Sequence, residues 1–177
     1  MEFIRVGDKL VSKDKLTRTV ERILALRAAG SSQQEVAHKV GVDRTFISRL
    51  EALAEVRKGG SLAIIGFPLA NKDELLRIAE ENGVDYTFMM TDDQRWKFIH
   101  SLTGVELLNE LMELITKLRY FDVVIMVGSD MRIRLAEALL GDKVVGVQLG
   151  ESPIENDVYF PPERLRELIL SVKGGEK

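Results

Sequence analysis

Four side chains that can donate hydrogen bonds recur within one short helix-prone segment: Arg44, Thr45, Ser48 and Arg49. Residues four positions apart lie on the same face of an α-helix, and Ile47 falls on the opposite, apolar face. A helix that is apolar on one side and carries Arg, Thr and Ser on the other suits the major groove of DNA. The segment therefore predicts contact with double-stranded DNA.

The residues before this helix are those that two short helices crossing at a tight turn require. Ala37 falls where the two helices would touch, and Gly41 falls at the turn, where the backbone is expected to need a positive φ. Ser32 and Glu35 predict a capping box on the first helix, and Asp43 predicts a carboxylate cap on the second. The shared apolar face would consist of Val36, Val40, Val42, Ile47 and Leu50. An ordinary helical hairpin, with no nucleic-acid role, is the alternative.

Charge distribution supports the first interpretation to a modest degree. Residues 1–58 hold 12 Lys/Arg and 8 Asp/Glu, a net charge of +4, whereas the remainder holds 13 and 20, a net charge of −7. Only the first part is therefore expected to approach phosphates. This part also predicts a β-hairpin or extended arm in residues 3–11 around Gly7-Asp8, and a helix over residues 17–29.

A second domain is predicted after a glycine-containing boundary at residues 57–61, which divides the chain into 1–58 and 59–177. Short apolar runs at residues 61–67, 86–90, 123–127 and 143–149 are typical of buried parallel strands. Helical patterns lie between and after them, at residues 72–82, 92–118, 131–140 and 162–172. The alternation predicts an α/β fold, Rossmann-like or flavodoxin-like, with a four-stranded parallel sheet and helices on both sides.

Loops at the carboxyl ends of two of these strands are candidates for a small-molecule site. In an open parallel sheet the ligand crevice opens at this edge, and its expected lining is Gly66, Phe67, Pro68, Gly128, Ser129 and Asp130. Ser129 or Asp130 would cap the following helix. The same residue types are also what strand-to-helix turns require. Neither a dinucleotide fingerprint nor a Walker loop is present, so we expect no cofactor. Backbone N–H groups at the helix start favour an anionic group, whereas Asp130 and the other acidic residues of this edge disfavour a highly charged one. We therefore expect a weakly anionic or neutral metabolite over a nucleotide triphosphate.

Carboxylates at the same edge define the rival hypothesis, an enzyme carrying a targeting module. Clustered carboxylates could hold Mg²⁺ or accept a phosphoryl group; the candidates are Asp92, Asp93, Asp130 and Glu151. Receiver domains, however, place their acidic pair after the first strand, where this chain has Gly66-Phe67-Pro68. No Ser/His/Asp arrangement is evident, and a non-enzyme is favoured.

The composition indicates in which cellular compartment the protein is expected. With 45% hydrophobic and 30% charged residues, the chain is expected to bury a core, and no segment approaches the roughly 18 apolar residues of a membrane span. The absence of cysteine excludes disulfides and thiolate metal sites. Charges near the N-terminus, where a signal peptide needs an apolar run, favour a cytoplasmic protein without a membrane partner.

Residues 16–53 resemble the Cro/C1-type, or xenobiotic-response-element, helix-turn-helix family of bacterial transcription regulators. The resemblance rests on Gln33, Ala37, Gly41-Val42, Ile47-Ser48 and Glu51. It implies that Gln33 faces a DNA phosphate and that Arg44, Thr45, Ser48 and Arg49 occupy base- and phosphate-reading positions. Domains of this family usually have five helices, whereas a glycine linker follows the third helix here.

Together these features predict a sequence-specific DNA-binding regulator whose α/β domain senses a ligand, mediates dimerisation, or does both. Residues 92–118 carry apolar side chains beyond what one sheet face plainly requires: Phe98, Ile99, Leu102, Leu107, Leu108, Leu111, Met112, Leu114 and Ile115. A homodimer interface there is one possibility, and coverage of the chain's own sheet is the other. A pure assembly protein, whose helix-turn-helix unit packs on protein, is a third class.

Overall fold

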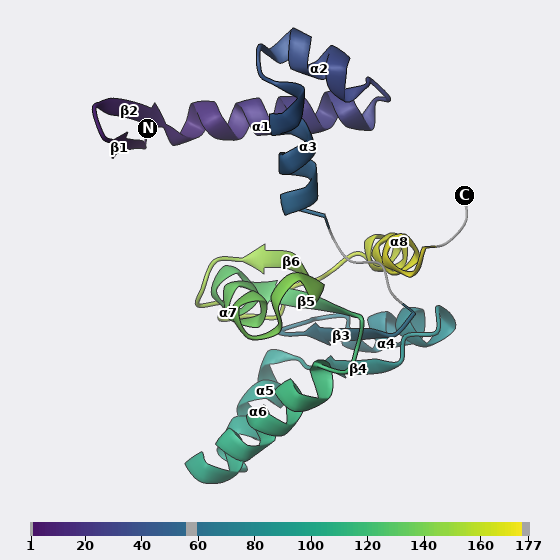
Figure 1. Ribbon diagram of the computed structural model, residues 1–177. Helices are drawn as coiled ribbons and strands as arrows, with labels where there is room; N and C mark the ends of the chain where they lie inside the picture. Colours follow the sequence, from purple (N-terminus) through teal and green to yellow (C-terminus); the bar gives the residue numbers. More distant parts are fainter. Residues whose placement is uncertain (1, 56–59, 175–177) are drawn as a thin grey trace. The chain divides into compact units, whose positions relative to one another are not determined.

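The computed structural model describes residues 2–55 and 60–174, which belong to two compact units, Met1–Glu55 and Val56–Lys177 (Figure 1). Most of the predicted boundary at residues 57–61 lies outside the described residues. Each unit is therefore considered by itself.

The first unit begins with a two-stranded antiparallel hairpin followed by three helices. The elements are β1 (Phe3–Val6), β2 (Lys9–Ser12), α1 (Lys13–Ala28), α2 (Gln33–Val40) and α3 (Arg44–Leu53). Phe3 pairs with Ser12 and Val6 with Lys9, so the turn falls at Gly7-Asp8, where Gly7 has a φ of +58°. The predicted hairpin is confirmed.

Local signals at the helix ends are confirmed in two of three cases. Ser32 and Glu35 form the predicted capping box at the start of α2. Gly41 ends that helix in the left-handed region, with a φ of +77°, which L-amino acids with a side chain adopt only at a cost. Asp43 occupies the N-cap position of α3 but makes no side-chain cap bond. That prediction was wrong, since the exposed carboxylate is free to be hydrated by water instead.

A small apolar core joins α1, α2 and α3. Its buried residues are Ile23, Val36, Ala37 and Ile47, with Leu26, Val40, Val42 and Leu50 packed around them. Ala37 accepts backbone hydrogen bonds from both Gly41 and Val42, at 2.9 and 3.1 Å. The apolar stripe of α1 is only partly covered, because Leu16 and Leu24 remain exposed.

The second unit contains the parallel sheet that the apolar runs predicted. Its elements are β3 (Leu62–Gly66), α4 (Lys72–Glu81), β4 (Tyr86–Met89), α5 (Asp92–His100), α6 (Gly104–Leu118), β5 (Val123–Ser129), α7 (Asp130–Leu140), a 3-10 turn (Gly141–Lys143), β6 (Val144–Gly150) and α8 (Pro162–Lys173). The strand order is β4-β3-β5-β6, with all neighbours parallel.

Helices cover both faces of this sheet, as expected for a parallel sheet. On one face, α4 and α8 contribute Leu75, Ala79, Leu165 and Ile169 to the larger core. On the other face, α6 and α7 contribute Leu114, Leu118, Ile133, Ala136 and Leu140. None of the helices in residues 2–55 and 60–174 is long and apolar enough to cross a membrane.

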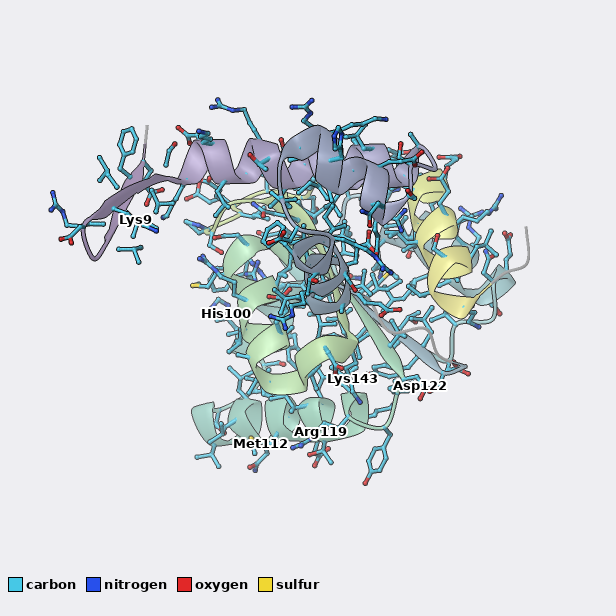
Figure 2. All side chains as sticks on the ribbon, turned by 45° about the horizontal axis from the view of Figure 1, so that its top comes forward. Lys9, His100, Met112, Arg119, Asp122 and Lys143 are labelled. Carbon is cyan, nitrogen blue, oxygen red and sulfur yellow. The ribbon has the colours of Figure 1, made fainter. Side chains whose placement is uncertain are left out.

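The helical region predicted at residues 92–118 is divided into two helices. α5 ends at His100, and Thr103 is the N-cap of α6, where it forms a further capping box in which Glu106 accepts from the Thr103 backbone N–H. At its other end α6 is held by Lys143, whose Nζ donates to the carbonyls of Arg119 and Phe121 at 2.8 and 2.9 Å (Figure 2). A cation at a helix C-terminus satisfies carbonyls that have no intrahelical partner.

The connections make β3 and β5 the switch point of the sheet. The crossover through α4 leads from β3 to β4 on one side, and the crossover through α5 and α6 returns past β3 to β5 on the other. Adjacent crossovers that leave in opposite directions open a site beyond the carboxyl ends of the two central strands. The segment after β6 returns to this edge, where Val158 pairs with Leu69 and donates to the Pro68 carbonyl.

We expect Gly41→Ala to lower the free energy of unfolding of the first unit by about 1–2 kcal/mol, because it places a Cβ in the left-handed region. No atom lies within 4 Å of that Cβ, so backbone strain alone would act. Hydrogen exchange of α2 and α3 peptides would measure the loss. Gly104→Ala, with open space and no positive φ, is the matched control, and equal protection in the two variants would contradict the expectation.

Candidate functional site

The outward face of α3 carries the polar residues predicted to contact DNA. Arg44, Thr45, Ser48 and Arg49 are all exposed, whereas Ile47 on the opposite side is fully buried. Arg49 has no ion-pair partner in the part of the chain that the structure describes. Phe46 lies among them and is 42% exposed. This face of α3 thus presents donors and one aromatic ring to the surroundings.

Arg44 is held in place by a chain of side chains from all three helices. Its Nε lies 3.4 Å from Oε1 of Gln33, and the Gln33 amide donates to Glu51 at 2.8 Å. The other Glu51 oxygen accepts from Nε of Arg27 at 2.5 Å. Arg27 also donates to the carbonyl of Ser31. The network fixes the first turn of α3 against α1 and α2.

This network changes the interpretation of Gln33. Its side chain is half-buried and both of its amide atoms are engaged within the unit. Gln33 therefore contacts Arg44 in the structure, and the phosphate contact that the resemblance implies stays a prediction. The link from Arg27 to Glu51 was not predicted, because the two residues are 24 positions apart and belong to different helices.

The two predicted strand-end loops are brought together in the second unit. The Phe67 amide donates to the Val127 carbonyl at 3.1 Å, which continues the β3–β5 ladder into the loops. Gly66 is needed for packing, since a Cβ there would lie 2.6 Å from Leu69 Cδ1. Gly128 lies between the two loops. A Cβ added to it would be 3.5 Å from the backbone carbonyl oxygen of Phe67 and 3.9 Å from the Cβ of Arg132.

Ser129 and Asp130 anchor the loop that follows β6. Ser129 is completely buried, and its hydroxyl lies 2.7 Å from that of Ser152. It occupies the N-cap position of α7 without making the side-chain cap bond that was predicted, because its hydroxyl is directed to Ser152. Asp130 accepts from the Ser152 amide at 2.8 Å, and this bond is the main reason that the pKa of Asp130 is lowered.

Three of the four carboxylates predicted at this edge are engaged in separate ion pairs, and the fourth, Glu151, is exposed. Asp92 pairs with Arg95, Asp93 with Lys97 at 2.6 Å, and Asp130 with Arg134 at 2.5 Å. Among the described residues no group of three or more His, Cys, Asp or Glu side chains could hold a metal ion. The acidic rim on which the enzyme hypothesis depended is therefore not a cluster of free carboxylates.

Two arginines at the strand-end edge were missed. Arg95 is only 8% exposed and has one buried nitrogen, Nε, without a hydrogen-bond partner among the described residues. Arg132 lies against Phe67, with its guanidinium carbon 5.0 Å from the ring centroid. In the sequence both residues look like ordinary surface cations on amphipathic helices, and only the strand order brings their helices to the same edge.

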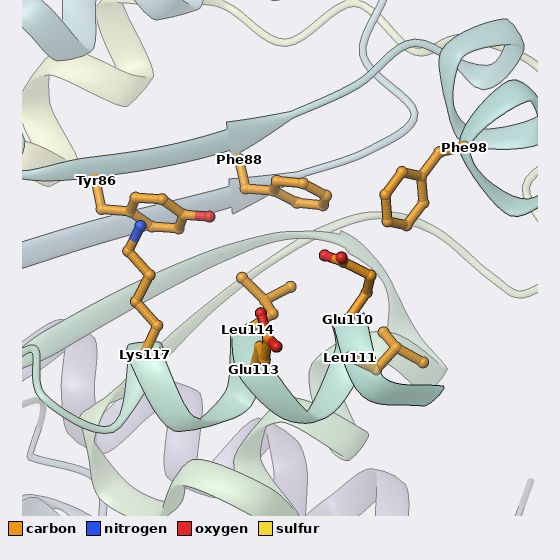
Figure 3. Close-up of a pocket in the computed structure, with 8 residues that line it drawn as sticks. All are labelled: Tyr86, Phe88, Phe98, Glu110, Leu111, Glu113, Leu114 and Lys117. Atoms are coloured by element: carbon orange, nitrogen blue, oxygen red, sulfur yellow. The ribbon is translucent and has the colours of Figure 1, made fainter. Parts of the chain in front are cut away.

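A separate hollow of about 320 Å³ lies between the edge strand β4 and helices α5 and α6 (Figure 3). Its wall on the sheet side is formed by Tyr86 and Phe88, and Phe98 closes one end. Lys117 reaches over the Tyr86 ring, with Nζ 3.8 Å from the centroid, and burial raises the pKa of that phenol. Glu110 and Glu113 line the side formed by α6. Charges of both signs around an aromatic wall make this hollow less selective for one class of ligand than the strand-end edge.

No family model matches this chain, and neither a curated protein nor a solved structure matches it.

Acid should loosen the first unit through Glu51. Hydrogen bonds from Arg27 and then Gln33, together with the charge of Arg27, hold the pKa of Glu51 below its ordinary value of 4.5. A carboxylate with a lowered pKa in the folded state stabilises that state above its unfolded pKa, and the contribution is lost as the pH falls through the folded pKa. Below pH 4.5, Glu51→Gln should therefore lose less stability per pH unit than the wild type.

The measurement is thermal unfolding by circular dichroism across this pH range. Glu21→Gln, which changes an exposed carboxylate on α1, is the matched control and should retain the wild-type slope. If the unfolding temperatures of the wild type and Glu51→Gln fall equally with pH, the network around Glu51 does not contribute to the acid sensitivity of the first unit.

Proposed function

We propose that the chain is a sequence-specific DNA-binding transcriptional regulator whose first unit is a helix-turn-helix domain. The observation that carries the proposal is the outward face of α3, where Arg44, Thr45, Ser48 and Arg49 are exposed together. Bidentate contacts from arginine to guanine, and hydroxyl contacts to bases or phosphates, need such an exposed row at the beginning of a helix. The Gln33–Glu51–Arg27 network supports it further, because a fixed Arg44 loses less conformational freedom on binding.

In this proposal the second unit senses a ligand and joins two copies of the chain. One helix-turn-helix unit reaches a single half-site, and dimers place two units about 34–36 Å apart along one face of the duplex. A regulator of this type therefore needs a self-association surface. The first unit offers the exposed hairpin, but a two-stranded ribbon is only marginally stable, whereas α6 offers a continuous helical surface.

Helix α6 has two apolar stripes, of which one is used by its own sheet. Leu114 and Leu118 form the stripe that packs on the sheet, and Leu111, which is 46% exposed, lines the hollow beside β4. The other stripe, with spacings of three, four and three residues, consists of Val105, Leu108, Met112 and Ile115. Val105, Leu108 and Met112 are 71%, 59% and 57% exposed, and Met112 projects outward from the helix (Figure 2). We name this second stripe the α6 seam.

The spacing of the α6 seam suits another helix of the same kind. Alternating steps of three and four residues are the pattern by which two helices pack knobs into holes. The positions beside the seam are uncharged: Asn109, Leu111, Thr116 and Leu118. Glu106, Glu110 and Glu113 fall on other positions, so two copies of α6 can pair without like charges facing each other. This neutrality favours a second copy over a strongly charged partner.

Arg44→Ala and Arg49→Ala should each weaken binding to a cognate duplex by about 1–3 kcal/mol if the arginine reads a base. If an arginine contacts only a phosphate, its removal should instead weaken the affinity equally for all DNA sequences. The slope of log affinity against log salt concentration should then fall in magnitude by about one. The cognate duplex would come from selection among genomic fragments, and fluorescence anisotropy would measure affinity. Arg166→Ala on α8 is the control, and unchanged affinity in the Arg44/Arg49 double variant would reject this role of α3.

Leu108→Glu and Met112→Glu should convert a dimer into a monomer, because each places a charge in the middle of the α6 seam where burial would be unfavourable. Light scattering on the full chain would give the mass. Leu170→Glu is the matched control, since Leu170 is 48% exposed on α8 at the other face of the sheet, and it should remain a dimer. A wild type that is monomeric at high concentration would exclude the α6 seam as an interface.

A further inference from the structure

We propose that the carboxyl edge of the sheet binds a small oxyanion, carried by a metabolite as a phosphate or a carboxylate, between Arg95 and Arg132. The inference rests on the proposed ligand-sensing role of the second unit and gives that ligand a chemical class. It also revises the expectation of a weakly anionic or neutral ligand, which assumed that free carboxylates dominate this edge.

Strand order brings the two arginines to this edge. Arg95 belongs to α5, which follows β4, and Arg132 belongs to α7, which follows β5. Both strands neighbour β3, so the two helices begin on either side of the loop that contains Phe67. Arg132 packs on the Phe67 ring, and its NH1 lies 3.4 Å from Ser129 Oγ. The arginines thus border the switch point, where open α/β sheets bind their ligands.

The position of each arginine within the first turns of its helix is unfavourable when the helix dipole is considered by itself. Arg95 is the fourth residue of α5, and Arg132 is the third residue of α7. Helix N-termini carry a partial positive charge, so the first turn favours acidic side chains and disfavours basic ones. Two helix N-termini and two guanidinium groups here add positive charge, and Asp92, Asp93 and Asp130 in the same first turns offset part of it. An oxyanion would be stabilised by all four.

Carboxylates of the protein neutralise only part of this charge. Asp92 pairs with Arg95, whereas Arg132 has no carboxylate within ion-pair distance in residues 2–55 and 60–174. Asp130 is engaged by Arg134 and by the Ser152 amide, and Asp157 accepts from the Asp92 amide at 2.6 Å. Burial first, and then the charge of Arg95, lowers the pKa of Arg132, whereas the negative charge of Asp92 acts in the opposite direction.

Unused donors at the same place point to a missing acceptor. Nε of Arg95 is buried without a partner among the described residues, which is costly for a charged donor. The hydroxyls of Ser129 and Ser152 share one hydrogen bond of 2.7 Å. One of their two protons is used in it, and the other has no acceptor among the described side chains and backbone groups. A bound oxyanion has the lone pairs that these donors lack.

Calorimetric titration of the full chain with inorganic phosphate, and separately with succinate, would test the site without DNA. The wild type should bind at least one of the two anions, and the stronger of the two identifies the group carried by the natural ligand. Arg132→Gln should weaken that affinity by roughly tenfold or more, as expected when a charged hydrogen bond is lost. A titration with sodium chloride at equal ionic strength is the control for non-specific effects of salt on the charges of the protein.

Two further variants distinguish this site from other basic surfaces. Arg166→Gln removes an arginine of α8 whose side chain is 49% exposed, and it should bind the anion within about twofold of the wild type. The Arg44/Arg49 double alanine variant should retain anion binding even where it loses DNA, so failure of the DNA-binding proposal and failure of this one are separable. Loss of anion binding in that double variant, an unchanged affinity in Arg132→Gln, or no binding of either anion by the wild type would each overturn the proposal.

Discussion

The parallel pairing of β3 with β5 is the constraint on which the arrangement of the second unit depends. Gly66 pairs with Val127, and the Phe67 amide continues the ladder, so the two loops after these strands have to lie together. β4 is then confined to the other side of β3 and β6 to the other side of β5. The pairing thereby brings α5 and α7 to one edge, and it directs the segment after β6 back to Pro68 and Leu69.

The same constraint explains why α6 is left with an uncovered face. A sheet of four strands offers room on one face for two helices, and α7 occupies the part over β5 and β6. α6 lies on the remaining part through Leu114 and Leu118, and the hollow beside Tyr86 and Phe88 shows that the edge strand is not fully covered. A helix with apolar residues around more than half of its circumference cannot bury both stripes on one sheet. Exposure of the α6 seam is therefore a consequence of the topology.

Much of the fold could be predicted from the sequence because its signals are local. The four apolar runs, the Ser32–Glu35 capping box and Gly41 each act within a few residues, and the structure shows each of them. The missed features depend on residues far apart in the chain. The Ser129 hydroxyl bonds to Ser152 instead of capping α7, and Arg95 lies beside Arg132 only because β4 and β5 flank β3. Strand order is not encoded in any local pattern. The loops that form a site between strands could therefore be predicted from the sequence, but the charged side chains that meet at that site could not.

Helix α7 gives the two proposed roles of the second unit a shared physical element. Its first turn holds Arg132 at the strand-end edge, and its inward side chains Ile133, Ala136 and Leu140 share a core with Leu114 and Leu118 of α6. A ligand can shift a conformational equilibrium only through contacts that differ between the two states. An oxyanion held by Arg95 and Arg132 contacts α5 and α7, the neighbours of α6 in sequence and in space. Any movement of α7 toward the anion would be transmitted to the packing of α6, and by reciprocity a change in the pairing of α6 would alter the affinity for the anion by the same factor.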